Sequence, residues 1–183
     1  MHRPATVDAL VAGGRRVAEQ FPHDDLSGFT SDFGGAYRQV ASSPEQALLF
    51  GVTMWDADAL ETVVGLALAQ LFGGKSAPLN FSRFPDWCAK CCSALFLVLF
   101  WQCMDDLISI ERSSTVGSAR DAWLAFAGLC GWDMPLAKSP PPCRMFRALG
   151  VFVDLRPLPM ASALIQVCEK TDRGDTVDAG FNC

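Results

Sequence analysis

The sequence predicts an α+β fold in which long helices pack on a mostly antiparallel sheet. Two apolar runs, residues 99–104 and 107–111, flank the polar pair Asp105 and Asp106, a pattern typical of two buried strands joined by a tight turn. Residues 114–130 repeat apolar side chains at helical spacing. Half of the 183 residues are hydrophobic, so the chain can bury a sizeable core.

The remaining elements follow from local patterns and from the positions of glycine and proline. Helices are expected at residues 7–20, 76–97 and 114–130, although Gly13 and Gly14 weaken the middle of the first. The apolar face of the last helix would carry Val116, Ala119, Trp123, Phe126 and Leu129. Further strands are expected at residues 29–33, 47–55, 63–72, 146–155 and 161–167.

Charge and apolar content limit the classes of function. The net charge of −5 argues against a strongly basic nucleic-acid surface within these residues. The first 20 residues lack the apolar core of a secretion signal, so an intracellular location is expected. The longest apolar run, residues 94–101, is far shorter than the roughly 20 residues that cross a bilayer, so no membrane partner is expected.

The eight cysteines are expected to be free thiols, because no secretion signal accompanies them. Residues 88–92 (CAKCC) contain a CxxC spacing. A zinc site would need a second such pair or histidines at suitable spacing, and the only histidines are His2 and His23.

Three carboxylates form a candidate metal site. Asp105 and Asp106 repel one another, and a bound divalent cation would stabilise the pair. Asp32 ends another predicted strand, so all three converge if that strand neighbours the hairpin in one sheet. Mg²⁺ prefers oxygen ligands of this kind, and two such ions about 3.5–4 Å apart stabilise the attacking and leaving oxygens in a displacement at phosphorus.

Five segments resemble, in order, the palm motifs of reverse transcriptases, especially those of retrotransposons. They are residues 32–40 (DFGGAYRQV), 73–83 (GGKSAPLNFSR), 103–106 (CMDD), 136–139 (LAKS) and 146–151 (FRALGV). The similarity covers residues 28–155. It departs from the family at Cys103, where Tyr is usual, and at Gln70 and Leu71, where Leu-Pro is usual.

The resemblance implies a polymerase palm-like antiparallel sheet with packed helices, with partial fingers and no thumb. It divides the chain into a remnant of the fingers at residues 1–27, the palm at residues 28–168 and a flexible tail at residues 169–183. Only Arg15, Arg16 and a short helix stand where the basic fingers of the family should lie.

The resemblance also implies catalytic roles. Asp32, Asp105 and Asp106 would bind two Mg²⁺ (or Mn²⁺) ions, with the backbone carbonyl of Phe33 as a further ligand. Lys138 would protonate or neutralise the pyrophosphate leaving group. The reaction would be attack of a primer 3′-hydroxyl on the α-phosphate of a deoxynucleotide, where catalysis is mostly positioning and charge stabilisation.

Other residues would hold the nucleotide and the primer. By the same resemblance, Tyr37 would stack under the incoming sugar and exclude a 2′-hydroxyl by steric contact. Phe72 and Gly73 would lie against the incoming nucleotide and the template base. The primer end would be held by the hydrophobic turn Leu149-Gly150-Val151.

The expected function is RNA-directed DNA polymerisation, with an RNA or DNA template-primer and deoxynucleotide triphosphates as partners. Because the basic grips of the family are missing, we expect a fragment with weak or no activity alone. Two alternatives remain open. One is a non-catalytic relic or domesticated palm domain that binds nucleic acid or protein. The other is an RNA-dependent RNA polymerase palm, in which Gly usually stands where Met104 is found and against which Tyr37 argues.

Overall fold

The computed structural model describes residues 5–71 and 73–156, which combine helices with antiparallel strands and confirm the predicted α+β class. The helices are α1 (Val7–Gln20), α2 (Pro44–Ala47), α3 (Ala77–Phe96) and α4 (Val116–Leu129), with the 3₁₀ turns η1 (Ala36–Gln39) and η2 (Leu136–Lys138). The strands are β1 (Leu26–Asp32), β2 (Gly51–Asp56), β3 (Glu61–Leu66), β4 (Trp101–Cys103), β5 (Asp106–Arg112), β6 (Met145–Ala148) and β7 (Val151–Asp154). Within the described ranges, no helix is long and apolar enough to cross a membrane.

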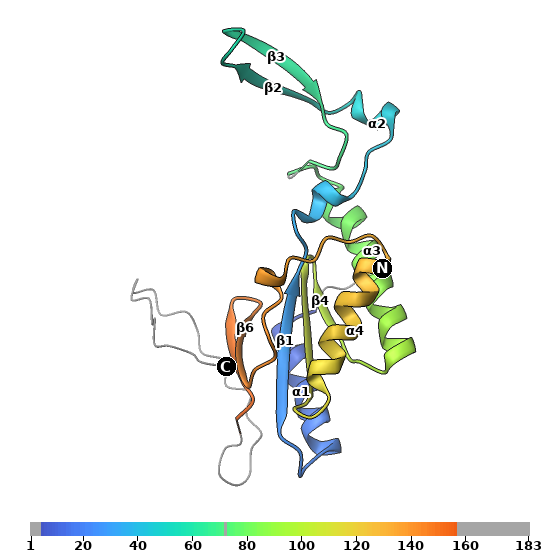
Figure 1. Ribbon diagram of the computed structural model, residues 1–183, viewed down its shortest axis with the longest axis vertical. Coiled ribbons are helices and arrows are strands. Elements are labelled where there is room, and N and C mark those ends of the chain that lie inside the picture. The colour runs from blue at the N-terminus through green and yellow to red at the C-terminus, as the bar shows by residue number, and fades with distance from the viewer. Residues whose placement is uncertain (1–4, 72, 157–183) are drawn as a thin grey trace, which may run out of the picture.

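A three-stranded antiparallel sheet, ordered β1-β5-β4, forms the centre of the molecule. Helices α3 and α4 lie on one side of this sheet, while α1 and the β6–β7 hairpin lie on the other (Figure 1). Successive side chains at the start of β5 point to opposite faces of the sheet. Leu107 packs in the cluster with α3 and α4, whereas Ile108 and Ile110 pack with α1, β6 and β7. The sheet is therefore buried on both faces and forms a rigid platform.

Aromatic side chains pack around the end of β1 on the side of α3 and α4. The Phe33 ring makes edge-to-face contacts with Phe81 and Trp132, at 5.5 and 5.3 Å between ring centroids. Trp123 of α4 contacts the same ring, and Phe33, Phe81 and Trp123 are almost wholly buried. Because Phe33 directly follows Asp32, this packing fixes the backbone that carries the Asp32 carboxylate.

Helix α1 approaches the sheet closely at Gly13, a residue that weakens the helix on propensity alone. A Cβ atom on Gly13 would lie 2.1 Å from Cζ2 of Trp101 in β4. Just before the helix, the backbone N–H of Ala5 donates to the carbonyl oxygen of Gln102, at 2.7 Å. Glycine thus makes room for the Trp101 indole, and this packing offsets the low helix propensity of glycine.

The β2–β3 hairpin projects away from the rest of the molecule (Figure 1). Its two strands pair only with each other, and most of their side chains are exposed. The exposed apolar residues of this hairpin are Met54, Trp55, Leu60, Val64 and Leu66. Its turn is fastened by Asp56, whose Oδ1 accepts hydrogen bonds from the backbone N–H groups of Asp58 and Ala59. The hairpin is therefore held mainly by its own backbone ladder and turn.

The strands of this projecting region do not have the bounds that the sequence predicts. The strand expected at residues 47–55 is wrong at its start, because Ser43 and Gln46 form a capping box that begins the short helix α2, and β2 begins only at Gly51. The strand expected at residues 63–72 begins earlier and ends at Leu66. Apolar residues lie just before β2 and just after β3, so composition alone does not mark where strand pairing begins and ends.

Two further expectations are corrected near the C-terminal end of the described chain. The strand expected at residues 146–155 is the β6–β7 hairpin, in which Leu149 and Gly150 form a two-residue turn with φ of 51° and 80°. In α4, Ala127 is buried and Leu129 is 86% exposed, so the predicted apolar face is wrong at its last member. The expected strand at residues 161–167 and the tail at residues 169–183 lie outside the described residues.

Candidate functional site

Asp32 and Asp106 stand opposite each other at one end of the central sheet. Asp32 is the last residue of β1, Asp106 is the first residue of β5, and the two are register partners. Asp106 also pairs with Cys103 of β4, so the two-residue turn is Met104-Asp105, in which Met104 has φ of 59°. The prediction that Asp105 and Asp106 form the hairpin tip is therefore wrong by one residue. As the predicted convergence of the carboxylates requires, β1 and β5 are neighbours in one sheet.

Lys138, the last residue of η2, brings a cation to this end of the sheet. Its Nζ lies 2.6 Å from Oδ2 of Asp32, while Oδ1 of Asp32 is buried without a hydrogen-bond partner. The pKa of Asp106 is raised by partial burial and by the charges of Asp105 and Asp32, an effect that Lys138 opposes. Lys138 forms its ion pair with Asp32, so Asp105 and Asp106 add negative charge that this ion pair does not neutralise.

The donor chemistry of this site suits a divalent cation, but the arrangement is not that of a formed metal centre. In the part of the chain that the structure describes, no three His, Cys, Asp or Glu side chains are grouped so as to hold a metal ion. The buried Oδ1 of Asp32 has no hydrogen-bond partner and is free to accept a ligand, and hard oxygen atoms of this type match Mg²⁺ or Mn²⁺. Asp32, Asp105 and Asp106 are the residues that would hold such an ion.

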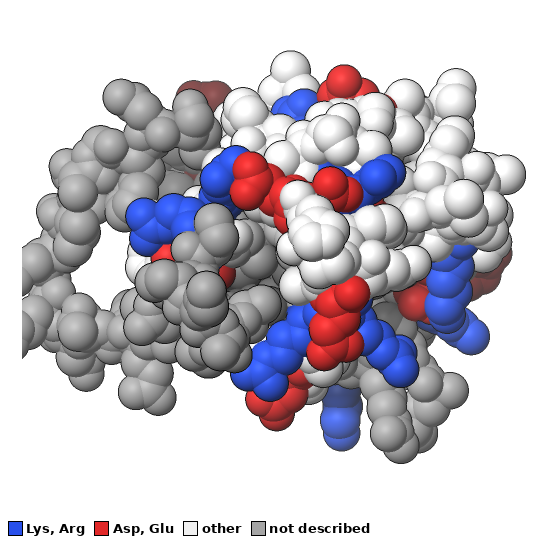
Figure 2. All heavy atoms as spheres, turned by 90° about the horizontal axis from the view of Figure 1, so that it is seen from below, with Lys and Arg blue, Asp and Glu red and all other residues white. Residues whose placement is uncertain are grey.

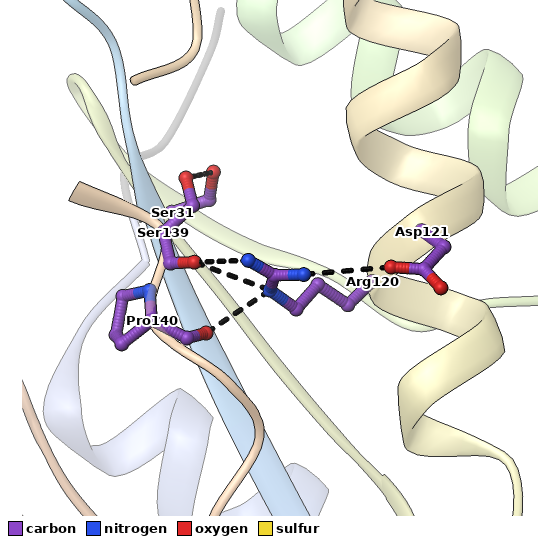
Figure 3. Close-up of polar contacts among 5 residues, drawn as sticks. All are labelled: Ser31, Arg120, Asp121, Ser139 and Pro140. Atoms are coloured by element: carbon purple, nitrogen blue, oxygen red, sulfur yellow. Dashed lines mark hydrogen bonds and ion pairs between the residues drawn. The ribbon is translucent and has the colours of Figure 1, made fainter. Parts of the chain in front are cut away.

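A buried polar network fixes the position of Lys138. The Oγ atoms of Ser31 and Ser139 lie 2.7 Å apart, and both serines are almost wholly buried. Arg120 of α4 donates from Nε to the carbonyl oxygens of Ser139 (3.2 Å) and Pro140 (3.0 Å) and from Nη2 to that of Ser139 (Figure 3). These contacts with helix α4 and strand β1 fix the position of the chain segment that directly follows Lys138.

Sequence reasoning missed Arg120 and assigned no role to Ser31 or Ser139. The two serines directly adjoin Asp32 and Lys138 in the sequence, and Ser139 ends the motif-like segment 136–139. Their contact spans 108 residues, so no local pattern predicts it.

A pocket of about 230 Å³ joins the carboxylates to the β6–β7 turn. Its lining includes Asp32 and Asp106 on one side and Leu149 and Gly150 on the other. These turn residues belong to the predicted primer grip, whose third member, Val151, begins β7. The lining also includes Arg147, a basic residue that sequence reasoning did not single out. The pocket therefore combines anionic, cationic and apolar groups within reach of one ligand.

The residues predicted to hold the nucleotide lie in different surroundings. Tyr37 of η1 is partly buried against Phe81, and burial together with the charge of Asp105 raises its pKa. The Phe33 side chain belongs to the core, so only its backbone is available to a ligand. Gly73 has φ of 88° and open space beside its Cα, and Phe72 lies outside the described residues.

Charges elsewhere on the surface are intermingled. In the view from below, acidic and basic side chains of the described residues are intermingled, and these residues form no continuous basic area there (Figure 2). Described ion pairs beyond the carboxylate site include Arg112–Asp24 at 3.7 Å and Arg144–Asp25 at 2.5 Å. This pattern agrees with the acidic balance of the whole chain.

Comparison of the chain with models of protein families and with curated proteins finds no significant match. The ordered motif residues and the placement of the carboxylates, Lys138 and the pocket are the features of this chain that indicate a function.

Proposed function

We propose that this chain is a reverse transcriptase-like palm domain that carries out template-directed nucleotidyl transfer with two divalent cations. The observation that carries the proposal is the pairing of Asp32 with Asp106 at one end of the β1–β5 ladder, beside Asp105 in the adjoining turn. The order of the five motif-like segments supports the same function. The three carboxylates would hold Mg²⁺ or Mn²⁺.

In the proposed reaction, a primer 3′-hydroxyl attacks the α-phosphate of a deoxynucleotide and pyrophosphate leaves. When bound, the two cations stabilise charge on the attacking and leaving oxygens. The pocket between the carboxylates and the β6–β7 turn would orient the primer end. Tyr37, whose pKa is raised by burial and by the charge of Asp105, would lie under the incoming sugar. Lys138 Nζ would neutralise the pyrophosphate or give it a proton.

The charge of the chain supports weak or no polymerisation by these residues alone. Template binding draws most of its free energy from Lys and Arg contacts with phosphates. The net charge here is −5, and acidic and basic groups are intermingled in the view from below (Figure 2). Arg147 at the pocket is one cation placed to contact a phosphate.

Calorimetric titration with Mn²⁺ tests the proposed metal site. Asp105→Asn should abolish Mn²⁺ binding, because it removes a charged oxygen ligand from the turn. Glu19→Gln, on the exposed surface of α1, is the matched control and should leave binding unchanged. Equal Mn²⁺ binding by the wild-type chain and Asp105→Asn would refute the site.

Primer extension on an RNA template, with Mg²⁺ or Mn²⁺ and labelled deoxynucleotides, tests the reaction. A low yield of product from the wild-type chain and none from Asp105→Asn is expected. Robust synthesis by the wild-type chain that Asp105→Asn abolishes would contradict the expectation of weak activity. A preference for ribonucleotides would instead favour an RNA-dependent RNA polymerase palm.

A non-catalytic relic or domesticated palm that binds nucleic acid or protein is the second candidate. The Lys138–Asp32 ion pair favours it, because Lys138 already neutralises one of the carboxylates that a metal ion needs. A chain that binds no Mn²⁺ and yields no primer extension would support this candidate.

A further inference from the structure

We propose that Lys138 is a built-in counter-ion of Asp32 that competes with a divalent cation for this carboxylate, and that Arg120 strengthens the competition by holding Lys138 in place. The inference rests on the proposed function, since it concerns how the same site takes up its metal ion. The carrying observation is the 2.6 Å contact between Lys138 Nζ and Asp32 Oδ2 in a site that also contains Asp105 and Asp106.

The competition follows from the geometry of the ion pair. A metal ion on Asp32 would bind the same carboxylate whose Oδ2 Lys138 already contacts, and two cations on one carboxylate repel each other. The ion pair is partly open to solvent, with 48% of the Lys138 side chain and 30% of the Asp32 side chain exposed. Solvent screening therefore keeps the pair weak enough for a divalent ion to displace the lysine. Displacement would free Lys138 Nζ for another anion.

Arg120 acts on Lys138 through the backbone that follows it. Its guanidinium donates to two successive carbonyl oxygens, of Ser139 and Pro140, and only 16% of its side chain is exposed. Ser139 is anchored in turn to Ser31, the residue before Asp32 (Figure 3). The network thus ties the residue after Lys138 to the residue before Asp32, which keeps the two charges together. Arg120 is a positioning residue, because its contacts are with the carbonyl oxygens of Ser139 and Pro140 and with Asp121.

The test is the dissociation constant for Mn²⁺, measured by calorimetry on the full chain. Lys138→Met removes the charge and keeps the length of the side chain, so it should bind Mn²⁺ roughly three- to tenfold more tightly than the wild-type chain. Lys90→Met is the matched control, because Lys90 makes an ion pair of the same 2.6 Å length with Asp86 on α3, and it should leave the affinity unchanged. If Lys138→Met is unfolded by circular dichroism, Lys138→Gln replaces it.

A double-mutant cycle tests the positioning role of Arg120. Arg120→Lys keeps the charge but loses the planar fork that spans two carbonyl oxygens, so it should tighten Mn²⁺ binding about twofold in the wild-type background. The same substitution should have no effect in the Lys138→Met background. An equal change in both backgrounds would show a general structural effect and would overturn this role.

The outcomes separate the inference from the proposed function on which it rests. Mn²⁺ binding that disappears in Asp32→Asn but is equal in the wild-type chain and Lys138→Met would overturn the competition and leave the metal site intact. Mn²⁺ binding that persists unchanged in Asp32→Asn, or none in any variant, would overturn the proposed metal site and the competition with it.

Discussion

The β1–β5 ladder and the β2–β3 hairpin are antiparallel pairings of similar length in very different surroundings. β1 has seven residues and β2 has six. Leu107, Ile108 and Ile110 of β5 are wholly buried, whereas Trp55 and Val64 of the hairpin are 63% and 70% exposed. Backbone pairing alone therefore does not make a rigid platform in this molecule. Asp32 and Asp106 stand on the ladder that side chains cover on both faces, which fixes their positions firmly.

The two regions should contribute unequally to the free energy of unfolding. An isolated two-stranded hairpin is marginally stable in water, while burial of apolar side chains supplies most of the stability of a folded domain. The hairpin should therefore tolerate substitutions that the central sheet and its helices do not. Three pairs of variants test this contrast, beginning with the largest expected effect.

Truncation of a tryptophan should separate the regions most clearly. Trp123→Ala, in the core of α4, should lower the free energy of unfolding by about 3–5 kcal/mol, because it leaves a large cavity among Phe33 and its neighbours. Trp55→Ala, in the exposed hairpin, should change it by about 0.5 kcal/mol or less. Urea denaturation followed by far-ultraviolet circular dichroism measures both. Similar losses in the two variants would show that the hairpin is packed against something in solution.

An added methyl group should give a smaller effect in the same direction. A Cβ atom on Gly28 of β1 would lie 2.3 Å from Cε1 of Phe146 and 2.8 Å from the carbonyl oxygen of Ser109. The backbone has little freedom to move away, because Gly28 and Cys143 exchange two hydrogen bonds of 2.9 Å. Gly28→Ala should therefore destabilise the chain by roughly 1–3 kcal/mol in urea denaturation.

The matched control for that variant lies in the hairpin. A Cβ atom on Gly51 of β2 would meet its nearest neighbour, Cγ1 of Val64, at 3.4 Å. Gly51→Ala should be neutral or should stabilise by up to about 1 kcal/mol, because alanine restricts the unfolded chain. A larger loss in Gly51→Ala than in Gly28→Ala would reverse the proposed order of rigidity.

The sequence predicts the covered region better than the projecting one. The helix expected at residues 7–20 matches α1, and the helix expected at residues 76–97 differs from α3 by one residue at each end. Each has a buried face that repeats at helical spacing. In the hairpin no face is buried, so the sequence has no alternation that marks strand ends, and the capping box of α2 interrupts the expected strand.

In the candidate site, too, some features follow from the sequence and others do not. The chain positions of Asp32, Asp105 and Asp106 at strand ends follow from local patterns, and the neighbouring strands bring Asp32 and Asp106 into register. The contacts of Lys138 and Arg120 depend on tertiary packing over 106 and 19 residues, so no local pattern contains them. The local pattern predicts one strand over residues 146–155, because leucine seldom adopts a positive φ, and only the resemblance implied a turn at Leu149.

The smallest expected effect is a difference in how two acids respond to pH. Burial raises the pKa of Glu111 in β5 above its ordinary 4.5, so its contribution to stability is greatest at acidic pH and is lost as pH rises through the raised value. Backbone hydrogen bonds from Ala59 and Asp58 lower the pKa of Asp56 in the hairpin below its ordinary 3.8, so its contribution is present at neutral pH and is lost as pH falls.

Glutamine and asparagine substitutions should therefore shift the urea midpoint in opposite directions at about pH 7. Glu111→Gln should stabilise by about 0.5 kcal/mol, since the amide oxygen still accepts from the Leu99 N–H and no charge is buried. Asp56→Asn should destabilise, since its charged hydrogen bonds to the turn are weakened. Both differences from the wild-type chain should shrink as pH falls, first for Glu111, whose pKa is raised, and only at lower pH for Asp56, whose pKa is lowered. A shift of the same sign in both variants would mean that burial does not distinguish the central ladder from the hairpin.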